Sequence, residues 1–307
     1  MTKEELLSSD NCRLCPRNCH ADRNGTQKGF CGEGSRVRIA RAALHFWEEP
    51  CISGKVGSGA VFFTGCSLRC IFCQNHNIAD GTVGREVTSE QLADIFLMLQ
   101  TKGAANINLV TAGHFLLQVV EALHLAKEKG LKIPIVYNSS GYERVEAIRQ
   151  LSGLVDIYLP DCKYYDSALS RDFSHAPDYF EIAAAAIAEM VTQAGELSFD
   201  ETTGLMKRGV IIRHLILPGH TKDSMKVLKY LHDTYQDSVY ISIMNQYTPV
   251  VRQSRFPELN RTVTKREYEK VIDFALQCGI TQAFIQEGDV AKESFIPKFD
   301  YEGVPKE

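Results

Sequence analysis

The sequence predicts an α/β protein: a partial (β/α)6 barrel with a small N-terminal Cys-rich metal-binding module. Three observations favour this fold class. Strand-like apolar runs alternate with helical patterns from residue 60 onward, whereas the first 50 residues show little of either periodicity. Seven of the ten cysteines fall into two tight groups, which indicates metal binding. We therefore predict the module over residues 1–50 and the barrel over residues 51–307.

The strands of the barrel are predicted from runs rich in Val, Ile, Phe and Tyr, because buried parallel strands are nearly continuously apolar. No Gly-x-Gly-x-x-Gly follows the first run, which disfavours a dinucleotide-binding sheet. The six or seven strand–helix units are too few for a complete eight-fold barrel, so a partial, open barrel fits better. The predicted strands cover residues 60–64, 106–111, 133–138, 155–160, 210–217, 239–244 and 281–286.

Helical patterns fill the intervals between these strands. Thr88 with Gln91, and Thr264 with Glu267, have the spacing of a capping box, which marks the start of a helix. Glycines stand at several of the expected helix ends, where a left-handed residue commonly terminates the helix. The predicted helices cover residues 88–103, 115–130, a segment after residue 142, and residues 177–195, 223–235 and 264–279.

Composition places the chain among ordinary globular proteins, with 44% hydrophobic and 23% charged residues. The net charge of -4 implies no nucleic-acid partner, and no apolar run is long enough to span a membrane. The first ten residues lack the apolar core of a signal peptide, so we expect a cytoplasmic protein. That compartment keeps thiols reduced, which favours metal binding over disulfides.

One cysteine group directly follows the first predicted strand. Cys66, Cys70 and Cys73 have the spacing Cys-x3-Cys-x2-Cys, on a loop at the carboxyl end of that strand, where barrel enzymes place their sites. Three thiolates can hold a [4Fe-4S] cluster and leave the fourth iron open. A structural zinc site normally requires four protein ligands, so a zinc knuckle is the weaker alternative.

The second group lies in the N-terminal module, whose first 41 residues carry eight Lys or Arg against five Asp or Glu. Cys12, Cys15, Cys19 and Cys31 are four thiolates that could close a tetrahedral zinc site or complete a second Fe-S cluster. Their spacing is neither that of a ferredoxin nor that of paired Cys-x2-Cys ribbons, so both metals remain open. Free surface thiols are the remaining alternative, and they would be an oxidation liability.

We call Cys66, Cys70 and Cys73 the triad. Its spacing, with Phe72 directly before the third cysteine, resembles the cluster-binding motif of the radical S-adenosylmethionine (SAM) superfamily. The resemblance implies a partial (β/α)6 barrel whose open iron binds the amino and carboxylate groups of SAM, with Phe72 against the adenine. It also implies reductive cleavage of SAM to a 5'-deoxyadenosyl radical. An electron donor such as flavodoxin or ferredoxin would supply the electron.

Three further segments resemble the activating enzymes of glycyl radical enzymes, of which pyruvate formate-lyase activase is the type. Asp161 and Lys163 match an Asp-x-Lys pattern, residues 138–142 resemble a Thr-Ser-Gly-Tyr-like turn, and residues 212–219 resemble a strand ending in Val-Pro-Gly, with Asp223 following. Asp161 and Lys163 lie on one face of a strand, where they could bind SAM or form a salt bridge. The resemblance implies that SAM is bound by Phe72, Gly113, Asn138, Ser140, Asp161, Lys163 and Arg213.

The resemblance spans essentially the whole chain and is greatest to an activase-like branch with an N-terminal Cys-rich segment. It departs from the activases after the second strand, where Gly-Gly-Glu is replaced by residues 111–115, Thr-Ala-Gly-His-Phe. Gly113 still permits a close backbone approach, but the acidic partner of the SAM amino group is missing. His114 either replaces that partner or is structural.

Three functions follow from these patterns. The first is an activating-enzyme-like oxidoreductase that makes a glycyl radical on a partner enzyme. The second is a radical SAM enzyme that modifies a small molecule or another protein side chain, and the third is a non-catalytic Fe-S or zinc scaffold. The scaffold is disfavoured, because a purely structural protein would not need an incomplete three-thiolate site beside an Asp-x-Lys pair.

Polar residues after the last two strands are candidate substrate contacts, whereas the sequence indicates no function for Trp47, Glu48 and Glu49. The candidate contacts are Gln246, Tyr247, Gln286 and Glu287.

Overall fold

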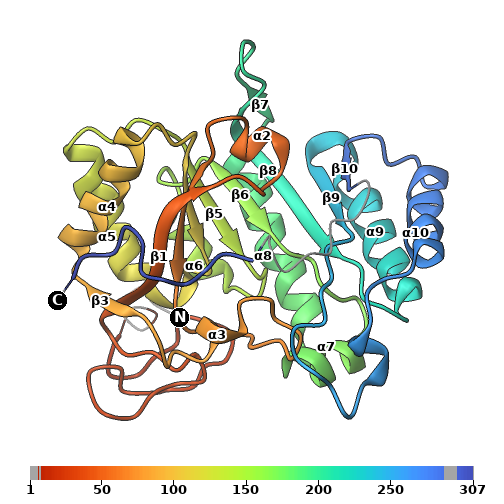
Figure 1. Ribbon diagram of the computed structural model, residues 1–307, viewed down its shortest axis with the longest axis horizontal. Helices are drawn as coiled ribbons and strands as arrows, with labels where there is room; N and C mark the ends of the chain where they lie inside the picture. Colours follow the sequence, from red (N-terminus) through yellow and green to blue (C-terminus); the bar gives the residue numbers. More distant parts are fainter. Residues whose placement is uncertain (1–5, 7, 287–295, 307) are drawn as a thin grey trace.

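The computed structural model describes residue 6, residues 8–286 and residues 296–306 (Figure 1). Seven parallel strands form the body of its sheet, and each predicted strand corresponds to one of them. In spatial order the sheet reads β10-β9-β8-β6-β5-β4-β2-β1-β3. The parallel strands are β2 (Ser58–Phe63), β4 (Ile107–Val110), β5 (Ile135–Ser139), β6 (Ile157–Pro160), β8 (Met206–Leu215), β9 (Tyr240–Met244) and β10 (Ala283–Ile285).

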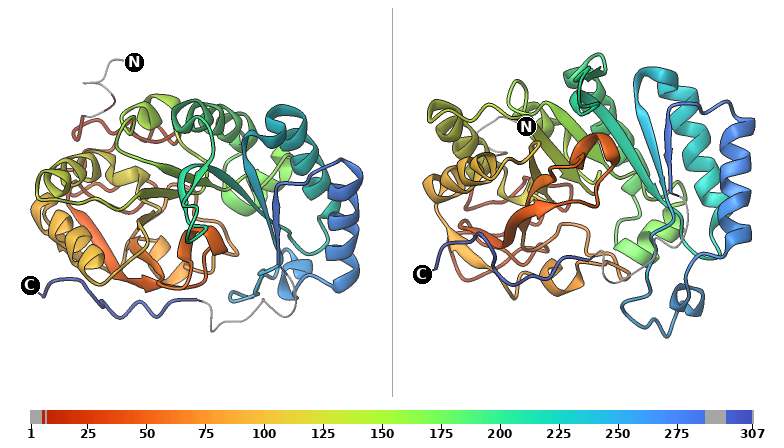
Figure 2. Two further views of the ribbon diagram at one scale, coloured as in Figure 1. Left: turned by 90° about the horizontal axis from the view of Figure 1, so that it is seen from above. Right: turned by 45° about the horizontal axis from the view of Figure 1, so that its top comes forward.

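The sheet does not close, because β10 and β3 are the two ends of the strand order. Helices lie along its outer side, as Figure 2 shows from above. The predicted partial (β/α)6 barrel is confirmed. The covering helices are α4 (Ser89–Thr101), α5 (Leu116–Glu128), α6 (Val145–Arg149), α8 (Tyr179–Ala194), α9 (Thr221–Tyr235) and α10 (Lys265–Gln277).

Both predicted capping boxes are present. The Thr88 side chain accepts from the Gln91 backbone N–H at the start of α4, and Thr264 does the same with Glu267 at the start of α10. The shortest elements were not predicted, because they depend on tertiary contacts. These are α2 (Pro50–Ser53), α3 (His76–Ala79), α7 (Ser167–Ser174), β7 (Ser198–Phe199) and the 3-10 turns at Gly113–Phe115, Gln236–Ser238 and Pro257–Asn260.

Strand β1 (Val37–His45) was not predicted either. It pairs antiparallel with β2 on one side and with β3 (Arg85–Val87) on the other. The C-terminal segment also bonds to β1, since the Tyr301 N–H donates to the Ala40 carbonyl at 3.0 Å. Part of the segment 1–50 therefore belongs to the barrel's sheet, and the boundary at residue 50 stays a prediction.

The two faces of the sheet differ in chemistry. One face packs on the helices through apolar residues such as Leu109 and Ile212. On the inner face, Val136 and Ile157 pack against Cys51 and Ile52 of α2, which fills that end of the barrel. Toward the carboxyl ends of the strands, polar side chains such as Asn138 and Asp161 lie beside apolar ones such as Phe62 and Val110. No helix in the described part of the chain is long and apolar enough to cross a membrane.

Candidate active site

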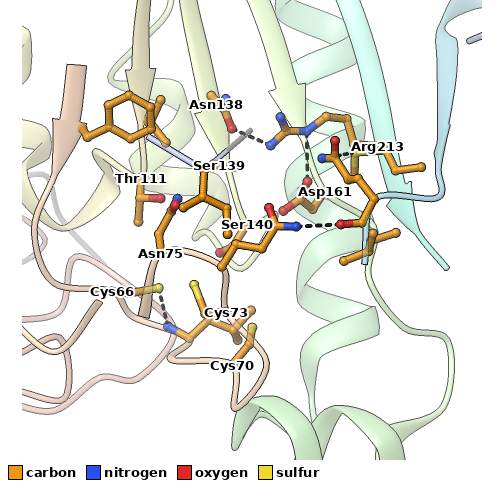
Figure 3. A pocket seen from close by; sticks show the side chains of 18 of the residues that line it. Cys66, Cys70, Cys73, Asn75, Thr111, Asn138, Ser139, Ser140, Asp161 and Arg213 are labelled. Carbon is orange, nitrogen blue, oxygen red and sulfur yellow. Dashed lines mark hydrogen bonds and ion pairs between the residues drawn. The ribbon is translucent and has the colours of Figure 1, made fainter. Parts of the chain in front are cut away.

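A pocket of about 220 Å³ opens at the carboxyl ends of the parallel strands, above the loop that follows β2 (Figure 3). The three cysteines of the triad face the polar strand ends across this pocket. Nine of the ten predicted triad and SAM-binding residues line it, although they come from the ends of three strands (β5, β6 and β8) and from one loop. They are Cys66, Cys70, Phe72, Cys73, Asn138, Ser140, Asp161, Lys163 and Arg213.

The loop that carries the triad turns sharply at Gly65. Its φ is +77°, and a Cβ there would lie 2.7 Å from the Cys31 carbonyl oxygen, so the position requires glycine. Within the loop, Cys66 Sγ accepts the Leu68 N–H at 3.3 Å. The Ser174 hydroxyl, at the end of α7, donates to Cys70 Sγ at 2.9 Å. Donors aimed at sulfur stabilise the thiolate form of a metal ligand.

The electrostatics of the triad fit a thiolate metal site. Burial raises the pKa of Cys73 to about 12 and also raises that of Cys70, while the Lys163 ammonium acts in the opposite direction on both. A metal must therefore displace the protons, as thiolate ligands require. Among the described residues, no group of three or more His, Cys, Asp or Glu side chains is placed so that it could hold a metal ion.

Asp161 stands at the centre of a charged network beside the triad. Arg213 Nε donates to Asp161 Oδ1 at 3.0 Å, and Lys163 Nζ contacts Asp161 Oδ2. Burial acts to raise the pKa of Asp161, but the charges of Lys163 and Arg213 outweigh it and hold that pKa below its usual range. The carboxylate is consequently ionised, and a cationic Lys163 remains at the pocket wall.

Arg213 extends this network across the sheet. Its Nη2 donates to Asn138 Oδ1 at 2.6 Å, and its Nη1 lies 3.4 Å from Glu48 Oε2. Glu48 Oε1 accepts in turn from the Asn108 side chain at 3.0 Å. Glu48, Trp47 and His45 line the pocket, although the sequence showed no role for them. Only the path of the chain from β1 into α2 brings them there, so no local signal could have revealed them.

Gly113 is the predicted SAM-binding residue that does not line the pocket. A Cβ at Gly113 would lie 2.5 Å from Glu143 Oε2, so its side-chain space is taken by a buried carboxyl group. His114 Nε2 lies 2.6 Å from the Thr64 carbonyl, and burial lowers the pKa of its imidazole to about 3. His114 is therefore a neutral structural residue. Thr111 lines the pocket instead, with a left-handed φ of 61° that is strained for a β-branched residue.

A family model described as the radical SAM superfamily matches residues 60–231, more than half of the chain. The chain belongs to the radical SAM superfamily. An uncharacterised protein of Methanocaldococcus jannaschii is 29% identical over 276 residues, which cover 86% of this chain and 74% of that protein. The pyruvate formate-lyase-activating enzyme of Clostridium pasteurianum is 26% identical over 219 residues, 68% of this chain and 82% of that enzyme.

Among solved structures, a radical SAM methyltransferase from Sphaerobacter thermophilus matches with a TM-score of 0.50 and 15% identity. The match covers 75% of this chain and 66% of that structure, and it concerns the fold alone. Membership of the superfamily implies a [4Fe-4S] cluster and SAM, so this protein is a radical SAM enzyme. The donor set in the pocket fits both groups: three thiols for the cluster, and paired charges for the ends of SAM.

The remaining predicted contacts divide between the pocket and the core. Gln246 lines the pocket of this radical SAM enzyme, and Gln286 Nε2 donates to its Oε1 at 3.2 Å. Tyr247 is buried instead, its hydroxyl donating to the Leu259 carbonyl at 2.7 Å, and its ring lies 5.9 Å from that of Phe72. Glu287 lies outside the described residues.

The N-terminal cysteines form a second group beside the radical SAM pocket. Cys12, Cys15 and Cys31 are buried and Cys19 is exposed. Burial raises the pKa of each buried thiol, and the charges of other cysteines in the group raise it further. The four thiols predicted as one set therefore lie near one another.

Proposed function

We propose that this radical SAM enzyme abstracts a hydrogen atom from a polypeptide substrate, with a glycine Cα as the target. The observation that carries the proposal is the meeting of the triad with Asp161 and Lys163 in one pocket. That Asp-x-Lys pair is the pattern by which the chain resembles glycyl radical activating enzymes, and the relative in Clostridium pasteurianum bears such a name.

The residues of the pocket would have separate roles in binding the cluster and SAM. Cys66, Cys70 and Cys73 would hold the cluster, and Lys163 and Arg213 would meet the carboxylate or ribose of SAM as charge-assisted donors. When bound, the cluster and SAM supply a 5'-deoxyadenosyl radical through reductive cleavage. Asp161 would keep both cations oriented, because it binds one with each carboxylate oxygen.

The surroundings of the pocket suit a large substrate. The sheet is open between β3 and β10, so a polypeptide loop could enter from the side. Phe46 and Trp47, at the turn between β1 and α2, are 49% and 60% exposed, and Trp47 lines the pocket. A reactive radical then needs a correctly held C–H bond and the exclusion of competing donors.

The same proposal includes a second metal centre and a reducing compartment. A metal would be bound by the four N-terminal thiols, Cys12, Cys15, Cys19 and Cys31. The cytoplasm keeps thiols reduced, and four neighbouring thiolates are a sufficient ligand set for a metal site. We place the enzyme there, with a glycyl radical enzyme or another protein as its substrate and a small flavodoxin or ferredoxin as its electron donor.

Electron paramagnetic resonance tests the activase function. The reduced enzyme and SAM are mixed with candidate glycyl radical proteins from the same organism. A doublet that appears on one of them, and is lost when its glycine is replaced by alanine, is the expected result.

Two outcomes would contradict the proposed function. If no protein acquires a radical while a metabolite extract stimulates 5'-deoxyadenosine formation, the substrate is a small molecule. If SAM is never cleaved by reduced protein that carries an intact cluster, the radical function itself is wrong.

A further inference from the structure

One carboxylate of the radical SAM pocket has no role in the binding of the cluster or SAM. Glu48 stands directly before α2 and lines the pocket, with 10% of its side chain exposed. Its Oε1 accepts from the Asn108 side chain at 3.0 Å, and its Oε2 lies 3.4 Å from Arg213 Nη1. Arg213 and Asp161 lie across the pocket from the cysteines (Figure 3), and Glu48 is attached to the other end of the Arg213 guanidinium from Asp161.

The register of the sheet places Glu48 deep in the barrel. Its partner Asn108 is opposite Val136 on β5, whereas the Asn138 that binds Arg213 lies two residues further toward the carboxyl end of that strand. Val136 in turn packs on α2, which fills the amino end of the barrel. Glu48 therefore belongs to the floor of the pocket, below the level of the residues that we assign to SAM.

Carboxyl groups outnumber cations on this floor. Lys163 and Arg213 both bind Asp161. The same Arg213 is the cation that acts on Glu48 and Glu49: burial raises the pKa of each of these two carboxyl groups, and the Arg213 charge opposes the rise. Three carboxyl groups thus share two cations in this part of the described structure, so the floor can accept one further positive charge.

Hydrogen-bond acceptors are in excess at the same place. Asn108 is fully buried, and its Oδ1 has no hydrogen-bond partner among the described residues. Glu49 is 8% exposed, and the same holds for its Oε2. Buried polar groups are nearly always paired, so unpaired acceptors on both sides of Glu48 indicate that a donor is missing.

The adjoining wall of the pocket is aromatic and uncharged. Trp47, Phe62 and His45 line it, and the rings of His45 and Phe62 meet edge to face at 5.9 Å. Burial and the charge of Arg41 lower the pKa of His45 to about 4, so its imidazole is neutral at physiological pH. Aromatic faces attract cations, and a carboxylate beside them adds a charged acceptor.

We propose that Glu48 determines substrate specificity by binding a cationic nitrogen group, an ammonium or a guanidinium, that the substrate carries. An ionised carboxylate can accept about four hydrogen bonds, and Glu48 receives one from Asn108 and one from Arg213, so it can accept more. The inference rests on the proposed function, because it takes this pocket as the place where the substrate binds. The cation would belong to a basic side chain of a polypeptide or to a small amine, and both present the same N–H donors.

The first test compares matched ligands on the wild-type enzyme with its cluster intact and SAM bound. n-Butylguanidinium carries the charge and the donors of an arginine side chain, and n-butylurea has nearly the same shape without the charge. Calorimetry should show that butylguanidinium binds at least about tenfold more tightly, the ratio expected for one charge-assisted hydrogen bond. Equal affinities, or no binding of butylguanidinium at millimolar concentration, would overturn the proposal.

The second test assigns the preference to Glu48. Glu48→Gln should bind the two ligands equally and should keep the SAM affinity of the wild type, whereas Glu48→Asp should recover part of the preference because it restores the charge. Glu181→Gln, at an exposed position in the first turn of α8, is the control and should keep the full preference. A full preference in Glu48→Gln, or a loss of SAM binding in that variant, would contradict the proposed role.

The third test locates the bound cation without any substitution. Trp47 is the single tryptophan of the chain and lines the pocket, so its fluorescence reports on this site. Butylguanidinium should change the Trp47 emission with the same dissociation constant as in calorimetry. Binding that leaves the emission unchanged would place the cation outside the pocket and would refute the proposal.

The last comparison distinguishes the two sources of the cation. An acetylated Gly-Arg-Gly amide is compared with its citrulline counterpart and with butylguanidinium. The arginine peptide should bind more tightly than the citrulline peptide. If it also exceeds butylguanidinium, the source is a polypeptide, and if it binds more weakly, the source is a small amine. Failure of the proposed radical function is distinguishable, because it would appear as absent SAM cleavage with dithionite while the preference for cations persists.

Discussion

Arg213 Nε donates a 3.0 Å hydrogen bond to Asp161 Oδ1, between the adjacent strands β8 and β6. The two residues also form a parallel bridge, so the sheet itself sets their separation. Both side chains are largely buried, at 14% and 13% exposure. A charge pair held in this way can present Lys163 and Arg213, which both line the pocket, to a ligand without rearrangement.

Replacement of Arg213 tests whether this pair serves SAM. Arg213→Gln removes one of the two cations on Asp161 and should weaken SAM binding while leaving the cluster spectrum intact. It should also destabilise the protein by about 3 kcal/mol, because a buried charge loses a partner. Calorimetry with SAM and urea unfolding measure the two effects. Arg208→Gln, an exposed position on the same strand, is the control. Unchanged SAM affinity in Arg213→Gln would make the pair structural.

The triad is tested one thiolate at a time. Each of Cys66→Ala, Cys70→Ala and Cys73→Ala should abolish SAM cleavage, since two thiolates cannot hold the cluster in its open-iron form. Production of 5'-deoxyadenosine and the thiolate-to-iron absorption band report the outcome. Cys278→Ser, at a half-buried position directly after α10, should retain both signals. Full activity in any of the three alanine variants would refute the assignment of the cluster.

The Ser174 hydroxyl should tune the triad cluster through Cys70. A donor to a ligand sulfur stabilises the reduced, more negative cluster, so Ser174→Ala should lower its reduction potential. The shift should be about 60 mV if the bond is about 1.4 kcal/mol stronger in the reduced state. Ser170→Ala is the control, because Ser170 is also buried in α7 but its hydroxyl donates to the Ser167 carbonyl and not to a cysteine sulfur. Redox titration that shows equal potentials in both variants would exclude this role.

His214 should make stability depend on pH. Burial lowers the pKa of its imidazole from 6.5 to about 4, so the folded state holds it neutral while the unfolded chain protonates it. Its contribution to stability is therefore complete above pH 6.5 and is lost as the pH falls toward 4. Over this window the free energy of unfolding should fall by about 1.4 kcal/mol per pH unit from this residue.

Unfolding of the His214→Gln variant isolates that contribution, because buried His114 and half-buried His45 also have lowered pKa values and add their own pH dependence. The wild type should lose more stability than His214→Gln between pH 6.5 and pH 4. His124→Gln, at an exposed position of α5, should follow the wild type. Parallel curves for wild type and His214→Gln would show that His214 is not held neutral.

The sequence alone determined the features that depend on neighbouring residues. Thr88 with Gln91 and Thr264 with Glu267 form their capping boxes within one helical turn, so the helix starts were predictable. Most of the parallel strands were predictable because β2, β4, β5 and β6 are buried on both faces, and each carries its own apolar signal. The spacing of Cys66, Cys70 and Cys73 likewise lies within a single loop.

Tertiary structure alone decided which distant residues meet. Strand β1 gains its partners only when β2 and β3 lie on either side of it, and its partly exposed face weakens the apolar signal. Glu48 contacts Arg213, and the Glu143 carboxyl group fills the space beside Gly113. Both contacts join residues far apart in the sequence, so no local sequence pattern predicts them. The hydrogen bond from the Cys66 N–H to the Cys31 carbonyl arises in the same way. Local spacing encodes helix caps and ligand loops, whereas the packing of the whole chain sets the separation between charges and between sites.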